Sequence, residues 1–319
     1  MNKNDVILPI LISFGISVIL SPIVIPFLKK LKFGQFVRDD GPESHLKKSG
    51  TPTMGGLIIL VSIVITSLFY LKDYPRIIPV LFATLGFGII GFLDDYIKVV
   101  MKRSMGLRAW QKMLGQLVIT GVFAYYIYAH TDLGTDIIIP FMNKSIDIEW
   151  LYFPLMFFVM LGTVNGANFT DGLDGLASSV TVLIATFFTI VAVAFRSGIE
   201  PITCATVGSL LGFLVYNVYP ARVFMGDTGS LALGGFVAST AYVLKMPLII
   251  LIVAFIYFAE VLSVIIQVTY FKKTGKRVFK MAPIHHHFEL CGWPETKVVA
   301  IFSIITAILC LVGMLAVNV

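Results

Sequence analysis

Residues 77–98, IIPVLFATLGFGIIGFLDDYIK, decide what kind of protein this chain is. The first 17 of these residues carry no charged side chain. The stretch is about as long as the ~20 residues that a helix needs to cross the hydrocarbon core of a bilayer. It ends on two adjacent aspartates, Asp94 and Asp95, with Lys98 one turn further on. The stretch therefore predicts a membrane-spanning helix that ends in acidic groups.

Comparable apolar runs recur along all 319 residues, of which 57% are hydrophobic and 13% charged. Outer-membrane strands alternate between apolar and polar residues, so continuous apolar runs indicate helices. We therefore predict an all-α integral membrane protein, with one polytopic membrane domain over 1–319 and about ten transmembrane helices. The predicted spans are 6–28, 54–71, 77–97, 113–130, 150–164, 175–195, 200–219, 229–244, 247–271 and 297–318.

The basic residues predict the orientation in the membrane. Alternate loops at 29–53, 98–112, 165–174, 220–228 and 272–297 hold 18 of the 24 lysines and arginines. Positive loops stay in the cytoplasm, so these loops are predicted to be internal and both termini external. The net charge of +6 is then mainly a topology signal and requires no nucleic acid partner. Among the external loops, 131–149 contains two β-prone stretches, which predict a small β-hairpin near 136–149.

The aspartate pair is the first of five features on the predicted inner face. Neighbouring helix residues point about 100° apart, so the two carboxylates share one direction only where the helix ends. Negative charge at a helix C-terminus is unfavourable against the helix dipole. A functional role is therefore favoured, and a solvated helix end is the alternative.

The second feature is NFTDGLDGLA at 168–177, in which Asn168, Asp171 and Asp174 recur every three residues. These side chains share one face if the segment is helical. The next predicted helix begins here, and its free N–H groups favour anionic ligands. The alternative, an N-cap, explains one aspartate but not both together with Asn168.

Two further features contain an aspartate between glycines and a run of histidines. In YNVYPARVFMGDTGSLALGG, 216–235, Asn217 ends one span and Asp227 precedes the next, and Asp227 is alternatively a simple turn residue. In MAPIHHHFELCGW, 281–293, three consecutive histidines suggest donors to phosphate. Zinc is the alternative there, and it is disfavoured because adjacent histidines cannot all converge on one metal.

The fifth feature is HLKKSGTPTMGG at 45–56, whose lysines are also expected from topology alone. Together the five features place carboxylates, amides, histidines and lysines on one membrane face. Oxygen ligands of this kind suit Mg²⁺, which commonly bridges protein carboxylates and substrate phosphates. The sequence therefore predicts a phosphate-handling site with a divalent cation, at the level of the lipid headgroups.

These motifs resemble the phospho-N-acetylmuramoyl-pentapeptide transferase family, within the superfamily of polyprenyl-phosphate N-acetylhexosamine-1-phosphate transferases. The resemblance covers nearly the whole chain. It rests on GTPTMGG (50–56), GFLDDYIK (91–98), NFTDGLDGLA (168–177), the 216–235 motif and MAPIHHHFEL (281–290). The histidine motif is the most specific, and it is similar to the muramoyl-pentapeptide branch rather than the N-acetylglucosamine branch.

The resemblance implies ten transmembrane helices, a homodimer, and an inward-facing active-site cleft on the cytoplasmic face of the bacterial inner (plasma) membrane. It implies Mg²⁺-dependent transfer of phospho-MurNAc-pentapeptide from UDP-MurNAc-pentapeptide to undecaprenyl phosphate, which yields lipid I and UMP. It further implies Asp94, Asp95, Asp227 and His285 as catalytic residues, with Asp227 as the Mg²⁺ ligand. The implied substrate-binding residues are Lys48, Thr53, Lys98, Lys112, Asn168, Asp171, Asp174, Asn217, Phe224, His286 and His287.

Two other functions are compatible with parts of the pattern. An undecaprenyl-phosphate N-acetylglucosamine-1-phosphate transferase would differ in the sugar nucleotide. A secondary transporter of an anionic solute would place ionisable groups near the middle of the bilayer. Glu260 is the one acid deep in a predicted span, and the sequence identifies no partner for it.

The chemistry of the nucleophile separates two mechanisms. A phosphate monoester has a second pKa near 6, so it is mostly a dianion at neutral pH and has little need of a general base. Direct attack by the lipid phosphate is therefore favoured. A double displacement through a phospho-aspartate at Asp94 or Asp95 stays open as the alternative.

Overall fold

The computed structural model describes residues 4–30, 48, 50–99, 101, 106–142 and 144–318. The predicted inner loop at 29–53 lies largely outside these described residues, as does part of the loop at 98–112. The longer helices are α1 (Asn4–Lys30), α3 (Gly56–Tyr70), α4 (Ile77–Val99), α5 (Ala109–His130), α6 (Tyr152–Thr170), α7 (Leu176–Phe195), α8 (Glu200–Asn217), α9 (Gly226–Val243), α11 (Phe255–Thr274) and α13 (Glu295–Val317). The shorter helical elements are α10 (Ile250–Val253), α12 (Ile284–Leu290) and two 3₁₀ turns at Glu149–Leu151 and Pro247–Ile249.

Each of the ten predicted ranges coincides with helical structure, but one of them is not a continuous helix. The predicted span 247–271 is interrupted: a 3₁₀ turn and the single-turn helix α10 precede Ala254, and α11 begins only at Phe255. Within the described residues, six helical segments are long and apolar enough to cross a membrane. These comprise α1, α4, α6 with its preceding 3₁₀ turn, α7, α11 and α13.

Helix α9 forms the buried axis of the protein. Every residue from Thr228 to Val243 is buried. Two glycines let neighbouring helices approach its first turn: a Cβ at Gly91 of α4 would lie 2.0 Å from the Asp227 carbonyl oxygen, and one at Gly56 of α3 would lie 2.2 Å from the Gly229 nitrogen. Backbone packs directly on backbone at both places, so the start of α9 is held between α3 and α4.

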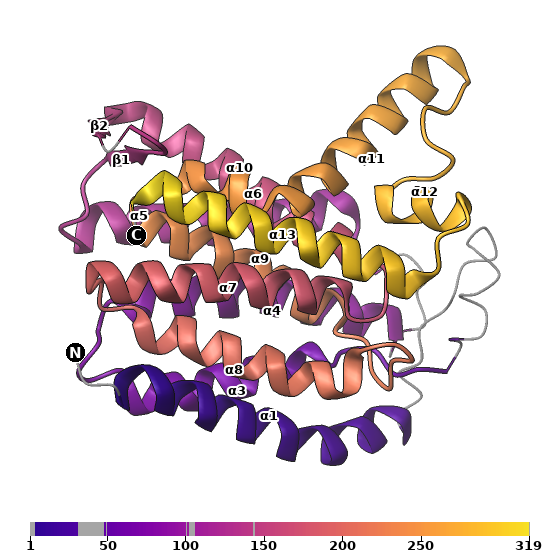
Figure 1. The fold of residues 1–319 in the computed structure, drawn as a ribbon, viewed down its shortest axis with the longest axis horizontal. Helices are drawn as coiled ribbons and strands as arrows, with labels where there is room; N and C mark the ends of the chain where they lie inside the picture. Colours follow the sequence, from indigo (N-terminus) through magenta and orange to yellow (C-terminus); the bar gives the residue numbers. More distant parts are fainter. Residues whose placement is uncertain are drawn as a thin grey trace.

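Most of the helices run side by side along one direction, whereas α11 leaves the bundle at an angle, and the chain then returns from the far end of α11 to α12, which lies beside the start of α13 (Figure 1). Both chain termini lie at the end of the bundle that also carries the two strands (Figure 1). Strands β1 (Asp136–Ile139) and β2 (Lys144–Asp147) pair antiparallel, with Asp136 opposite Asp147 and Ile139 opposite Lys144. The predicted β-hairpin is thereby confirmed.

The hairpin is attached to the C-terminal end of α9. Lys245 follows that helix; its Nζ lies 2.9 Å from Asp136 Oδ1, and its carbonyl oxygen accepts the Ile138 N–H at 2.7 Å. Asp227 stands at the opposite end of the same 18-residue helix. At 1.5 Å per residue, the hairpin and Asp227 are separated by about 27 Å along the axis.

Candidate active site

Asp227 is the meeting point of four helices. It lies in the first turn of α9, at the positive end of the helix dipole, which favours negative charge. Its Oδ2 lies 2.9 Å from both Lys98 Nζ of α4 and Lys112 Nζ of α5, and its Oδ1 accepts a hydrogen bond from Asn168 Nδ2 of α6 at 2.8 Å. Three side chains that lie 59, 115 and 129 positions from Asp227 in the sequence therefore converge on its carboxylate.

The environment of Asp227 keeps it ionised. Burial by itself would raise the pKa of its carboxyl group, but the neighbouring Asp94 carboxyl and the positive charges of Lys112 and Lys98 outweigh burial and hold the pKa well below its ordinary value. Charge-assisted hydrogen bonds to two ammonium groups are among the strong ones in proteins. Asp227 is thus a fixed negative charge with cations on one side.

The two adjacent aspartates of α4 point to different partners. Asp94 is 2% exposed; its Oδ1 accepts the Leu107 N–H at 2.7 Å, and its Oδ2 lies 2.5 Å from Lys98 Nζ. Asp95, in contrast, caps α9: its Oδ1 accepts the Asp227 N–H at 3.2 Å, and its Oδ2 accepts the N–H and the hydroxyl of Thr228 at 2.9 and 2.6 Å. Asp94 therefore orders a lysine and a loop, whereas Asp95 holds the helix that carries Asp227.

The turn between α6 and α7 adds two more carboxylates. Burial, followed by the charges of Asp227 and Asp95, raises the pKa of Asp171 well above its ordinary value, against the hydrogen bond that Asp171 accepts from the Gly226 backbone. Asp174 is 4% exposed and accepts hydrogen bonds from Lys48 Nζ at 2.7 Å and from the Ala221 N–H at 2.8 Å. Negative charge is thus concentrated around the start of α9.

The structure places three other predicted residues around the same helix start. Asn217 is buried, donates to the Val223 carbonyl at 2.9 Å and accepts the Ser178 hydroxyl at 2.7 Å, so it holds the loop before α9. Thr53 is 8% exposed, and its hydroxyl would lie 2.7 Å from a Cβ at position 226. The half-buried Phe224 joins the same loop to the start of α3, since its carbonyl accepts the Gly55 N–H at 2.8 Å.

The three consecutive histidines have three separate environments on α12. His285 Nδ1 lies 3.0 Å from Glu260 Oε1, and His286 Nδ1 lies 2.7 Å from Glu289 Oε2. His287 Nδ1 accepts the Lys280 N–H at 3.1 Å. In the described part of the chain there is no group of three or more histidine, cysteine, aspartate or glutamate side chains that could by itself hold a metal ion. The arrangement therefore does not favour the zinc alternative.

The donor set is nevertheless compatible with Mg²⁺. Mg²⁺ takes only one or two protein carboxylates when substrate phosphates and water complete its octahedron. Asp227 is an ionised carboxylate, and burial, followed by the negative charges of Asp227 and Asp95, raises the pKa of Asp171; a divalent cation would relieve this crowding of negative charge. Oxygen ligands without sulfur or imidazole are also what Mg²⁺ prefers.

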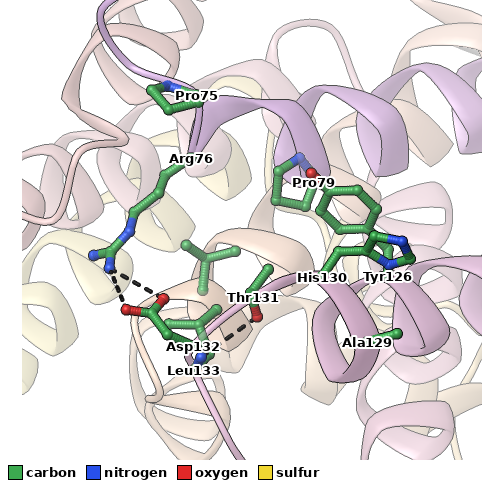
Figure 2. A pocket seen from close by; sticks show the side chains of 10 residues that line it. Pro75, Arg76, Pro79, Tyr126, Ala129, His130, Thr131, Asp132 and Leu133 are labelled. Atoms are coloured by element: carbon green, nitrogen blue, oxygen red, sulfur yellow. Dashed lines mark hydrogen bonds and ion pairs between the residues drawn. The ribbon is translucent and has the colours of Figure 1, made fainter.

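A cavity of about 600 Å³ lies at the other end of the bundle, near the start of α4 and the end of α5 (Figure 2). Arg76 reaches into it from one side and pairs with Asp132 at 3.2 Å, while His130 and Tyr126 lie on the other side (Figure 2). Its lining contains none of the predicted site residues. Its arginine is also already paired, so we place the candidate active site at the carboxylate and lysine cluster.

Sequence reasoning missed two residues of this cluster. Glu295, the first residue of α13, lies 2.6 Å from Lys48 Nζ and accepts the Asp174 N–H at 2.5 Å. In the sequence it resembles any acidic residue that follows a proline at a helix start. Ser230 accepts a hydrogen bond from Asn168 Nδ2 at 2.8 Å, and a serine one turn after Asp227 carries no signal of its own.

Comparison with known proteins gives concordant matches. The model of glycosyl transferase family 4 matches residues 77–245, and signature 1 of the phospho-N-acetylmuramoyl-pentapeptide-transferases matches residues 48–60. A phospho-N-acetylmuramoyl-pentapeptide-transferase of Clostridium botulinum is 57% identical over 96% of this chain and 95% of its own length. Proteins of that name from Caldicellulosiruptor bescii and Clostridioides difficile are 54% and 53% identical, over 97% and 96% of both chains.

Proposed function

Because the chain belongs to the phospho-N-acetylmuramoyl-pentapeptide-transferase family, we propose that it transfers phospho-MurNAc-pentapeptide from UDP-MurNAc-pentapeptide to undecaprenyl phosphate. The products are lipid I and UMP. The observation that carries the proposal is the convergence of Lys98, Lys112 and Asn168 on the ionised Asp227 at a helix N-terminus. Such a site can bring two phosphorylated substrates together, which is the main obstacle to this reaction.

In the proposed mechanism, an oxygen of the lipid phosphate attacks the sugar-linked phosphorus of the UDP-sugar. A new phosphoanhydride bond forms, the old one breaks, and UMP leaves with its electron pair. Lys98 and Lys112 carry positive charge beside Asp227 and would neutralise phosphate oxygens as the two anions approach. Asp94 holds Lys98 in place, and Asp95 holds the first turn of α9.

Mg²⁺ belongs to this proposal. Asp227 would be its protein ligand, and the bound ion would supply Lewis acidity and charge neutralisation at the diphosphate. The remaining predicted residues would bind the nucleotide and sugar. Phe224 would stack against the uracil. The polar groups of the substrate would be contacted by Asn168, Asp171, Asp174 and Asn217 around the cleft and by Lys48, Thr53, His286 and His287. His285 would donate to phosphate.

The proposal also includes the membrane arrangement: ten transmembrane spans, both termini external, a cleft open to the cytoplasm at the bacterial inner membrane, and a homodimer. The ends of the bundle support the orientation, because both termini and the hairpin lie together and Asp227 lies at the other end of α9 (Figure 1). Impermeant maleimide should then label a cysteine introduced at 144 in intact cells, and one at 276 only after permeabilisation.

The decisive experiment is incubation of the purified protein with UDP-MurNAc-pentapeptide, undecaprenyl phosphate and Mg²⁺, with UMP release as the readout. Asp227→Asn keeps the shape of the side chain and removes its charge, so it should lower turnover by orders of magnitude while the protein still folds. Asp132→Asn, at the far end of the bundle, is the matched control and should retain full turnover. Absence of UMP release from the wild-type protein, or normal turnover of Asp227→Asn, would contradict the proposal.

A further inference from the structure

Glu260 is a buried acid whose partners the sequence does not reveal. It lies in the second turn of α11 and is 0% exposed. The chain turns back after α11, and the start of α12 supplies both partners: Oε2 accepts the Ile284 N–H at 2.8 Å, and Oε1 lies 3.0 Å from His285 Nδ1. Both carboxylate oxygens are thus occupied by donors from the histidine motif.

The other nitrogen of the His285 ring points toward the candidate active site. His285 is 1% exposed, and its Nε2 is buried and has no hydrogen-bond partner among the described residues. A Cβ at Gly172 would lie 2.1 Å from this nitrogen, so the ring abuts the turn that carries Asp171 and Asp174. Buried ring nitrogens are normally satisfied, which makes an unpaired one beside a site a pointer to a ligand.

The chemistry of the pair determines what that nitrogen offers. A carboxylate at Nδ1 requires a proton there, so it selects one tautomer and one ring orientation. It also stabilises the imidazolium, in which Nε2 carries a proton as well and becomes a donor. A phosphate oxygen is the acceptor that such a charged donor binds best.

We propose that Glu260 is a positioning residue, which holds His285 so that its Nε2–H donates to a phosphate oxygen of the substrate at the 171–174 turn. This inference rests on the proposed function, because the phosphate belongs to one of the two substrates named there. Glu260 itself does not touch substrate; it acts through the ring of His285. Gly172 is part of the arrangement because any side chain there would displace Nε2.

Two variants of Glu260 test the charge. Glu260→Gln leaves one acceptor oxygen for two donors, so its amide group must face either Ile284 N–H or His285 Nδ1. Either outcome removes the negative charge that favours the doubly protonated ring, so Nε2 is at best an uncharged donor, and we expect a 10–100-fold lower kcat/KM, the range typical of such supporting contacts. Glu260→Asp keeps the charge and should recover part of that loss. A KM change for UDP-MurNAc-pentapeptide alone, or for undecaprenyl phosphate alone, identifies which phosphate receives the bond.

A double-mutant cycle separates positioning from mere folding. His285→Asn keeps a donor where Nδ1 lies, so Glu260 stays paired, but it lacks the atom that corresponds to Nε2. If Glu260 acts through Nε2, Glu260→Gln should cost nothing further in the His285→Asn background. Two full, additive losses would overturn the proposal, as would normal turnover of Glu260→Gln in a protein whose wild type releases UMP. A wild-type protein that releases no UMP would instead contradict the proposed function.

A spectroscopic measurement gives a readout independent of turnover. The chain has five histidines, so ¹⁵N-histidine labelling and comparison with His285→Asn assign the His285 ring signals. We expect a proton on Nδ1 in the folded wild type, and a changed Nδ1 signal in Glu260→Gln. Gly172→Ala should move the Nε2 signal while Glu260 stays paired. A ring protonated only on Nε2 in the wild type would overturn the proposal.

Discussion

The cap that Asp95 places on α9 yields the most quantitative prediction. Thr228 is fully buried, and its hydroxyl donates to Asp95 Oδ2 at 2.6 Å. The valine in Thr228→Val has nearly the same shape and removes only this hydroxyl. The backbone N–H of residue 228 still donates to Asp95, so the cap is weakened rather than lost.

The expected cost follows from the type of bond. A hydrogen bond to a charged group contributes about 1.5–3 kcal/mol. At roughly 2 °C per kcal/mol for a large domain, Thr228→Val should lower the unfolding midpoint by about 3–6 °C. Asp95→Ala removes the acceptor for all three donors and leaves buried N–H groups unpaired, so its loss should be larger.

The assay is thermal unfolding in detergent micelles of Thr228→Val, Asp95→Ala and the double variant, with UMP release measured in parallel. Once Asp95 is absent, the Thr228 hydroxyl has lost its acceptor, so Thr228→Val should cost almost nothing in that background. The coupling energy should therefore equal most of the 1.5–3 kcal/mol assigned to the bond. Turnover should fall in both single variants, because the turn that carries Asp227 loosens.

Two results would refute this reasoning. Strictly additive losses of stability would mean that the two side chains do not interact. If Asp95→Ala were as stable as the wild type but had lost all turnover, Asp95 would instead take part directly in the chemistry.

Three further outcomes are expected. Gly91→Ala should destabilise the protein by about 1–3 kcal/mol, because its Cβ would lie 2.0 Å from the Asp227 backbone. Gly88→Ala should destabilise it less, because its Cβ would lie 2.8 Å from a Leu60 methyl group, which can rotate away. Burial would raise the pKa of Asp136, but hydrogen bonds from Lys245 and Ser145 outweigh burial and lower it. The contact between Lys245 and Asp136 should therefore stabilise the hairpin above pH ~4 and be lost as the pH falls through the lowered pKa, which faster amide exchange in β1 would show. Lys245→Met should lose the same contact already at neutral pH. Labelled UMP should not exchange into the UDP-sugar when polyprenyl phosphate is rigorously removed, because direct attack needs the lipid; exchange that Asp94→Asn abolishes would indicate a phospho-aspartate.

The helices could be predicted because continuous apolar stretches leave few alternatives to a helix in a bilayer. The interruption at Ala254 could not be predicted, because the apolar sequence LIILIVAFIYFA, 248–259, continues through it without glycine or proline. The same limit applies to Glu295 and Glu260, whose partners come from distant parts of the chain. The periodicity of apolar residues indicates which secondary structure a segment forms, but it does not indicate which segments come into contact.

The candidate site was predictable as a group because its polar residues sit at helix ends on one face, where no apolar pattern explains them. Their individual roles were not predictable. In the sequence, Asp94 and Asp95 are neighbouring residues of the same type, and both are expected to have the same role. On a helix they point about 100° apart, so they necessarily reach different neighbours. One carboxylate meets Lys98 and the Leu107 N–H, and the other meets the first turn of α9. A doubled aspartate at a helix end is therefore better understood as one contact to the charge cluster and one contact to the scaffold, and only substitution of each separately distinguishes them.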